Sequence, residues 1–310
     1  MPPLWAAWLS MLLATQAPAP QPTLSEILDR VAEEAEVLEQ NAPKALTQET
    51  LEHRTLIPPP RFLPRVGKAA TVTPKPRLMV REIVSEYSVG TLKESDSRNL
   101  LEFRQVISVD GRRVQSAEHA RHALSLGIQS PDDRVRKRML EDFAKHGLVD
   151  VATDYGLILL AFTKRGLENI QLKPAGETRV GTEVALVFSW RQTSADGGEL
   201  DFFGNQAVHR PLQGMLYVRK SDGLPLRVQA WAEHPDAKRT IRDEAAVDYT
   251  LSAHGFLMPA SVVHRHLVDG QIKTENLYRY EPFKLFSADA EIKFTEVPET
   301  PPPPPEPTKK

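Results

Sequence analysis

Residues 264–280 read HRHLVDGQIKTENLYRY, two stretches of alternating side chains joined by Asp269-Gly270. An Asp-Gly pair between such stretches is the strongest short-range signal for a β-hairpin, because a type I′ turn requires positive φ at both central residues. Further Asp-Gly pairs occur at residues 110–111, 196–197 and 222–223. The four pairs together predict a meandering antiparallel sheet.

Alternating segments continue along most of the chain. We expect roughly nine to eleven strands, more than a flat open sheet holds without curling. The predicted fold is therefore α+β: a strongly curved antiparallel half-barrel with helices on its concave side and an N-terminal amphipathic helix. The segments that carry the strand pattern are 83–89, 101–109, 170–172, 180–190, 224–230, 245–251 and 272–280.

Two helices are expected to interrupt the sheet, at residues 116–126 and 131–146. The second is well marked, because Ser130 is a plausible N-cap, Pro131 suits the first helical position and Gly147 suits the end. The run LILLAF at residues 157–162 is too uniformly apolar to distinguish a buried strand from a buried helix. Either interpretation places it in the core.

The composition divides the chain into five parts. An apolar helical stripe with Thr23 and Ser25 as candidate caps marks the first folded part, and its glutamate-rich back is interpreted as a solvated face. Six prolines between Leu56 and Pro76 favour an extended connector. The predicted parts are an export signal (1–19), an amphipathic helix (20–43), a Pro-rich connector (44–79), the half-barrel domain (80–295) and a disordered Pro-rich tail (296–310).

The first residues predict export. Residues 4–13 (LWAAWLSMLL) are apolar and roughly half as long as a membrane-spanning helix, and small residues follow at 14–17. A cleaved signal and an uncleaved interfacial anchor both fit this pattern. The predicted location is periplasmic or secreted.

Composition and motifs argue against several functions. The chain has no cysteine, which excludes thiol nucleophiles, thiolate metal sites and disulfides. Lysine plus arginine (39) nearly balances aspartate plus glutamate (41), so nucleic acid is not a predicted partner. Phosphate-binding glycine loops, the G-x-S-x-G elbow and the zincin motif do not occur. The sequence therefore predicts neither an enzyme nor a cofactor.

His264 and His266 form the best local cluster of metal-binding side chains. Their spacing places both imidazoles on one face of a strand, but no third ligand is evident. A solvent-facing polar edge of the sheet is the favoured interpretation. The same weighting applies to His119 and His122 on a helix, so no metal site is predicted.

A pattern of strands and glycine turns runs through residues 214–228 and 245–294. It ends in a Y-x-x-F hairpin in the second of these segments. The residues that carry it are Gly214, Asp222, Gly223, Pro225, Tyr249, Gly255, Pro259, Tyr280 and Phe283. The pattern resembles the end of outer-membrane lipoprotein-sorting and lipoprotein-carrier proteins. Residues 101–114 (LEFRQVISVDGRRV) are similar to a segment of large uncharacterised exported bacterial proteins with the same sheet. The resemblance implies a half-barrel around an apolar cavity that accepts acyl chains in the periplasm.

The first functional hypothesis is a non-enzymatic exported protein that binds an apolar or lipid-like ligand, such as an acyl chain, in the half-barrel. The alternative is an envelope scaffold or sensor with a packed interior, whose N-terminal helix (23–41) or Pro-rich tail contacts a protein partner. An enzyme with a metal between His264 and His266 ranks third. The candidate cavity or core positions are Leu157, Ile158, Leu186, Phe188, Trp190, Leu226, Val228, Tyr249 and Tyr278.

Overall fold

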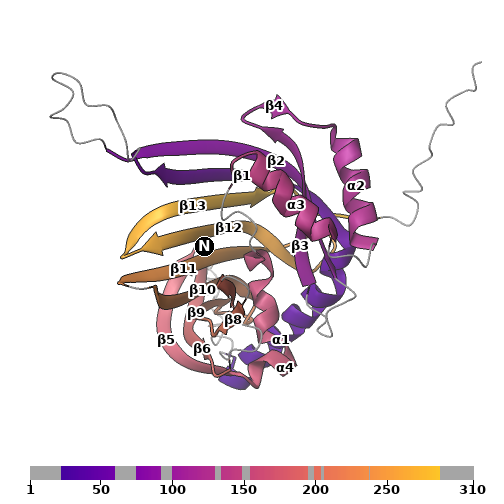
Figure 1. Cartoon of the computed structure of the whole chain (residues 1–310). Helices are drawn as coiled ribbons and strands as arrows, with labels where there is room; N and C mark the ends of the chain where they lie inside the picture. Colours follow the sequence, from indigo (N-terminus) through magenta and orange to yellow (C-terminus); the bar gives the residue numbers. More distant parts are fainter. Residues whose placement is uncertain are drawn as a thin grey trace, which may run out of the picture.

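The computed structural model describes residues 22–59, 75–91, 100–129, 134–148, 154–194, 199–203, 206–236 and 238–286. These residues form one large antiparallel sheet of 12 strands and a separate pair, β7 with β8. The sheet is strongly curved and does not close, and some of the helices lie along its inner side (Figure 1). The predicted α+β half-barrel is thereby confirmed. The strand order is β4-β3-β2-β1-β13-β12-β11-β10-β9-β6-β5, with β14 paired to β1.

All neighbours in the sheet are antiparallel, and most follow one another in sequence. The exceptions are the pairs β1 with β13 and β6 with β9, which connect distant segments. The strands are β1 (Ala45–Ile57), β2 (Arg77–Thr91), β3 (Leu100–Val109), β4 (Arg112–Arg113), β5 (Ile170–Val180), β6 (Glu183–Gln192), β7 (Glu199–Phe203), β8 (Gln206–Arg210), β9 (Gln213–Arg219), β10 (Pro225–Asp236), β11 (Arg239–Leu251), β12 (Leu257–Val268), β13 (Gln271–Tyr280) and β14 (Lys284–Leu285).

Helices α1 and α2 begin near the residues that the sequence marks. Thr23 caps α1 in a capping box with Glu26, as the Ser/Thr-x-x-Glu pattern predicts. The LILLAF run is neither a strand nor an α-helix but part of a 3₁₀ segment, η3. The helical elements are α1 (Leu24–Asn41), η1 (Ala42–Lys44), α2 (Ala117–Gln129), α3 (Arg134–Lys145), η3 (Tyr155–Phe162) and α4 (Lys164–Leu167).

Two of the four Asp-Gly pairs form the expected turns. Asp110 and Gly111 have φ values of 51° and 73°, and Asp269 and Gly270 have 51° and 72°, as a type I′ turn requires. At residues 222–223 only the glycine has positive φ, so the type I′ prediction is wrong there. The Asp222 carboxylate instead binds the Arg219 guanidinium at 2.7 and 2.8 Å. The pair at 196–197 lies outside the described residues.

The expected connector differs most from the structure. Residues 45–57, assigned to the connector at 44–79, form β1 in the middle of the sheet. The side chains of Thr47, Glu49 and His53 face inward and are polar, and the outward-facing residues between them are polar as well. The sequence of β1 therefore lacks the alternation of apolar and polar residues that predicts a strand. The predicted export signal, the Pro-rich tail and the start of the helix at 131 lie outside the described residues.

One face of the sheet is buried from β3 across to β6, whereas the edge strands β4 and β5 have no buried residue. The segment η3 contacts β3, β10, β11 and β12, and α1 lies against η3. Helix α2 packs on the opposite face of β2, where Arg121 pairs with Glu86 at 2.9 Å. The concave face is therefore covered by α1 and η3 rather than by a second sheet.

Candidate functional site

The candidate cavity residues lie in the core of the concave face. Leu157, Phe188, Trp190, Val228, Tyr249 and Tyr278 are between 0% and 7% exposed and belong to one continuous apolar cluster. Ile158 and Leu186 are partly buried and pack against that cluster. Leu226 is half-buried and lies outside it. The positions chosen from the sequence therefore meet mostly in one region, where η3 covers the sheet.

The segment η3 is weakly held by its own backbone. It runs for eight residues as a 3₁₀ helix, a form that rarely exceeds three or four because its hydrogen-bond geometry is poor. The bonds at its two ends, Leu157 N to Asp154 O and Thr163 N to Leu160 O, are both 3.3 Å long. Asp154 gives no side-chain cap. The position of η3 therefore depends on contacts with the sheet and with α1.

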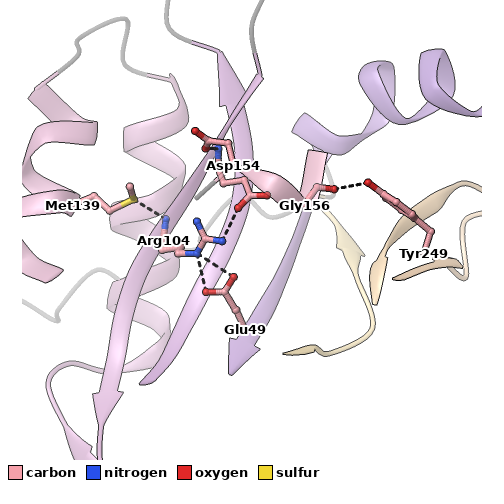
Figure 2. Close-up of polar contacts among 7 residues, drawn as sticks. Glu49, Arg104, Met139, Asp154, Gly156 and Tyr249 are labelled. Atoms are coloured by element: carbon pink, nitrogen blue, oxygen red, sulfur yellow. Dashed lines mark hydrogen bonds and ion pairs between the residues drawn. The ribbon is translucent and has the colours of Figure 1, made fainter. Parts of the chain in front are cut away.

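Tyr249 of β11 is the main polar anchor of η3. Its hydroxyl donates to the Gly156 carbonyl at 3.0 Å and accepts from the Leu159 amide at 3.0 Å. Figure 2 shows the Tyr249 side chain reaching from its strand to Gly156. Burial raises the pKa of Tyr249, so the phenol stays a neutral donor and acceptor. At the other end of η3, the Phe162 ring meets Trp190 edge to face at 5.2 Å.

Replacing Tyr249 by Phe is expected to loosen η3 without opening the sheet. The change leaves the buried Leu159 amide and Gly156 carbonyl unpaired, a loss of about 1–3 kcal/mol in the free energy of unfolding. Urea denaturation followed by circular dichroism measures the loss. The control is Tyr217→Phe, which removes a half-buried hydroxyl bonded to Gln229 at 3.0 Å. Equal losses in both variants would show that Tyr249 does not anchor η3.

A charged cluster lies beside the start of η3. The Arg104 Nε donates to the two Glu49 carboxylate oxygens at 2.8 and 3.0 Å, and Nη2 donates to Glu102 Oε2 at 2.5 Å. All three residues are at most 3% exposed. The guanidinium also lies 5.2 Å from the ring centres of both Tyr87 and Tyr278. In Figure 2 the Arg104 guanidinium on β3 points at Glu49 on β1, across the strand β2 that lies between them.

The cluster carries one carboxylate more than its single guanidinium can neutralise. Burial lowers the pKa of Arg104, but the carboxylates of Glu49 and Glu102 outweigh it and hold the pKa well above its usual range. Burial raises the pKa of Glu102 to about 7, although Arg104 opposes the shift. Glu102 Oε1 and the hydroxyls of Tyr87 and Tyr280 are buried and have no hydrogen-bond partner among the described residues. The cluster therefore has one more carboxylate than guanidinium groups and, within the part of the chain that the structure describes, three buried oxygen atoms without a hydrogen bond.

A second polar array crosses β1, β13, β12 and β11. His53 Nδ1 lies 2.7 Å from Asn276 Oδ1, and Asn276 Nδ2 lies 3.3 Å from His264 Nδ1. Asp243 then lies 3.6 Å from His264 Nε2 and 2.8 Å from His266 Nδ1. Burial would raise the pKa of Asp243, but the two imidazoles hold it well below its usual range. The array fixes the register of four strands through buried hydrogen bonds.

The histidine pair differs from its sequence interpretation. His264 is 3% exposed and stacks on Tyr155 of η3 at 5.3 Å, so it does not form a solvent-facing edge. The carboxylate partner, Asp243, lies 21 residues away on the neighbouring strand, where sequence spacing gives no sign of it. His119 is exposed on α2, and His122 is half-buried.

Two kinds of feature are absent from the described residues. No group of three or more His, Asp or Glu side chains placed to hold a metal ion occurs there. Within the same ranges, no helix is both long and apolar enough to cross a membrane.

The convex face carries a shallow pocket over β10, β11 and β12. The Arg242 guanidinium lies over the Trp231 ring at 4.8 Å. Arg227 pairs with Asp248 at 2.5 Å in the same pocket. Its arginines are matched by carboxylates, so the pocket has little net charge to attract a ligand.

Among known proteins, only solved structures show similarity to the chain. No model of a known protein family matches the chain, and no curated protein matches it. Seven chains of solved structures match. One is an outer membrane lipoprotein-sorting protein domain from Vibrio parahaemolyticus, 8% identical, covering 86% of this chain and 94% of that one at a TM-score of 0.34. Another is a DUF1329 family protein from Desulfovibrio piger, 8% identical, covering 85% and 95% at a TM-score of 0.35.

Proposed function

We propose that the protein is a non-enzymatic exported protein that binds an acyl chain on the concave face of its half-barrel, in the place that η3 occupies. One observation carries the proposal. An apolar region of an open sheet is covered by an eight-residue 3₁₀ segment with long terminal hydrogen bonds. Such a cover can be exchanged for a ligand more easily than an α-helix or a strand.

The exchange is energetically reasonable because it replaces one apolar occupant by another. An acyl chain gains about 0.8 kcal/mol for each buried methylene group. Displacing η3 exposes Leu157, Leu159 and Phe162, which are at most 5% exposed in the closed chain. An eight-residue 3₁₀ helix is roughly 16 Å long at about 2.0 Å per residue, so an acyl chain of comparable length can replace it. A long chain then offsets the exposure, whereas a short one does not.

The proposed location in the bacterial envelope rests on the sequence. The apolar run at residues 4–13, followed by small residues, has the form of an export signal. Carriage of a lipid between membranes requires such a location, and it needs no catalytic residue.

Tryptophan fluorescence tests ligand binding at η3. The chain has four tryptophans, of which two lie among the described residues. Trp190 packs its ring against Phe162 of η3, whereas Trp231 lies under Arg242 on the convex face. In a full-length variant with Trp5, Trp8 and Trp231 replaced by Phe, titration with monomyristoylglycerol is expected to shift Trp190 emission and to saturate near one lipid per chain. Glycerol, which lacks the acyl chain, is the ligand control.

A matched variant reports from the convex face. It keeps Trp231 and replaces Trp190 by Phe, so its emission is expected not to respond to the lipid. Unchanged Trp190 emission throughout the titration would contradict acyl-chain binding at η3. It would favour the scaffold alternative, in which the packed interior is permanent and partners bind elsewhere.

A further inference from the structure

We propose that Glu102 is a proton-operated latch: η3 stays on the concave face while the carboxyl is protonated and is released when the carboxyl ionises. This inference rests on the proposed exchange of η3 for a ligand and assigns its regulation. It concerns a residue that belongs to none of the apolar positions of the proposed ligand site.

Glu102 lies on β3, directly against the start of η3. A Cβ atom built on Gly156 would lie 2.3 Å from Glu102 Oε1 and 3.4 Å from the Tyr87 hydroxyl, so only glycine lets η3 approach this closely. The Glu102 amide also donates to Asp154 Oδ1 at 2.8 Å, just before η3 begins. The closed position of η3 therefore seals Glu102 Oε1 from water.

The charged and titratable groups around Glu102 come from every packed element. They are Glu49 on β1, Tyr87 on β2, Arg104 on β3, Asp154 beside η3, Tyr249 on β11, and Tyr278 and Tyr280 on β13. Arg104 is the one cation among them, and Glu49 already holds it through two hydrogen bonds. An ionised Glu102 therefore adds a negative charge that the closed site cannot neutralise. A neutral carboxyl can donate a hydrogen bond toward Tyr87.

The direction of the pH effect follows from the burial of Glu102. Because burial raises the pKa of Glu102 from an ordinary 4.5 to about 7, the closed state keeps a proton that the solvated carboxyl loses. The closed state is thus most favoured relative to the open state below about pH 4.5. Its relative stability falls as the pH rises to about 7 and stays constant above that pH.

Hydrogen exchange without ligand tests the latch by itself. After correction for the intrinsic pH dependence of exchange, opening of residues 154–163 is expected to increase about tenfold to a hundredfold between pH 5 and 8. In Glu102→Gln the opening is expected to stay low and independent of pH. The variant keeps His53, His264 and His266, so a pH response that survives in it would be theirs and would overturn the proposal.

A second variant keeps the test decisive if Glu102→Gln does not fold. Asp154 raises the pKa of Glu102, so Asp154→Asn, which can still accept the Glu102 amide, is expected to move the opening midpoint to lower pH. A midpoint that does not move would overturn the latch.

Monomyristoylglycerol, which does not ionise in this range, is then titrated at pH 5 and 8. Opening with no lipid binding at either pH would refute the proposed function and leave the latch in place.

Discussion

Replacing Arg104 by Met is expected to lower the free energy of unfolding by about 3–5 kcal/mol, because two carboxylates then remain buried without a counter-charge. Glu49 and Glu102 are each 1% exposed, so water cannot replace the lost guanidinium. The methionine keeps an apolar side chain between the rings of Tyr87 and Tyr278, so loss of the charge is the main change. Urea denaturation at pH 8 measures the loss, because in the unchanged protein Glu102, with a pKa of about 7, is ionised there and pairs with Arg104.

Two controls define the origin of that loss. Arg219→Met breaks a partly exposed pair with Asp222 and is expected to cost about 0–1 kcal/mol. The triple variant Glu49→Gln, Glu102→Gln and Arg104→Met removes all three charges and is expected to recover most of the stability. If Arg104→Met cost no more than Arg219→Met, the cluster would not be the buried charge network described.

Replacing Gly214 by Ala is expected to lower the free energy of unfolding by roughly 3 kcal/mol, since overpacking at a rigid backbone cannot relax. A Cβ atom at this position would lie 1.8 Å from the Gln229 carbonyl oxygen and 2.8 Å from Trp190 Nε1. Those two atoms are themselves hydrogen bonded at 3.1 Å. The added methyl group therefore separates β9 from β10 or breaks the Trp190 bond.

The matched glycine control is Gly181→Ala in the β5–β6 turn. A Cβ atom there meets nothing within 4 Å, and the φ of +59° leaves only the strain of a left-handed residue, about 1–2 kcal/mol. A thermal melt that ranks the two variants equally would show that β9 and β10 are not this close. The expected order is a clearly larger loss for Gly214→Ala.

The sequence predicts local structure well wherever one residue decides the backbone. Asp269-Gly270 sets a hairpin turn and Thr23 starts α1, because both act on their immediate neighbours. The strand β1 was missed for a physical reason: its inward side chains at Thr47, Glu49 and His53 are polar, and only distant partners make their burial favourable.

The polar part of the candidate site could not be found in the same way. Glu49 and Arg104 are 55 residues apart, and Asp243 meets His266 through strand register alone. Register of distant strands is set by the whole sheet, which single-sequence periodicity does not describe. The apolar positions were easier, since alternation alone places Val228 and Tyr249 on the inner face.

The polar and apolar parts of the concave face meet at η3. Tyr249 anchors the segment from one side, and Glu102 contacts Gly156 from the other. The account therefore depends on whether an acyl chain takes the place of this segment.

Hydrogen exchange of residues 154–163 at pH 5, where η3 is closed without ligand, tests that claim most directly when it is measured with and without saturating monomyristoylglycerol. The account predicts faster exchange in these residues when the lipid is bound, including the Leu159 amide that Tyr249 holds, while β11 and β12 are unchanged or better protected. Exchange that stays the same or slows at residues 154–163 while lipid is bound would contradict it, because η3 would then remain in place.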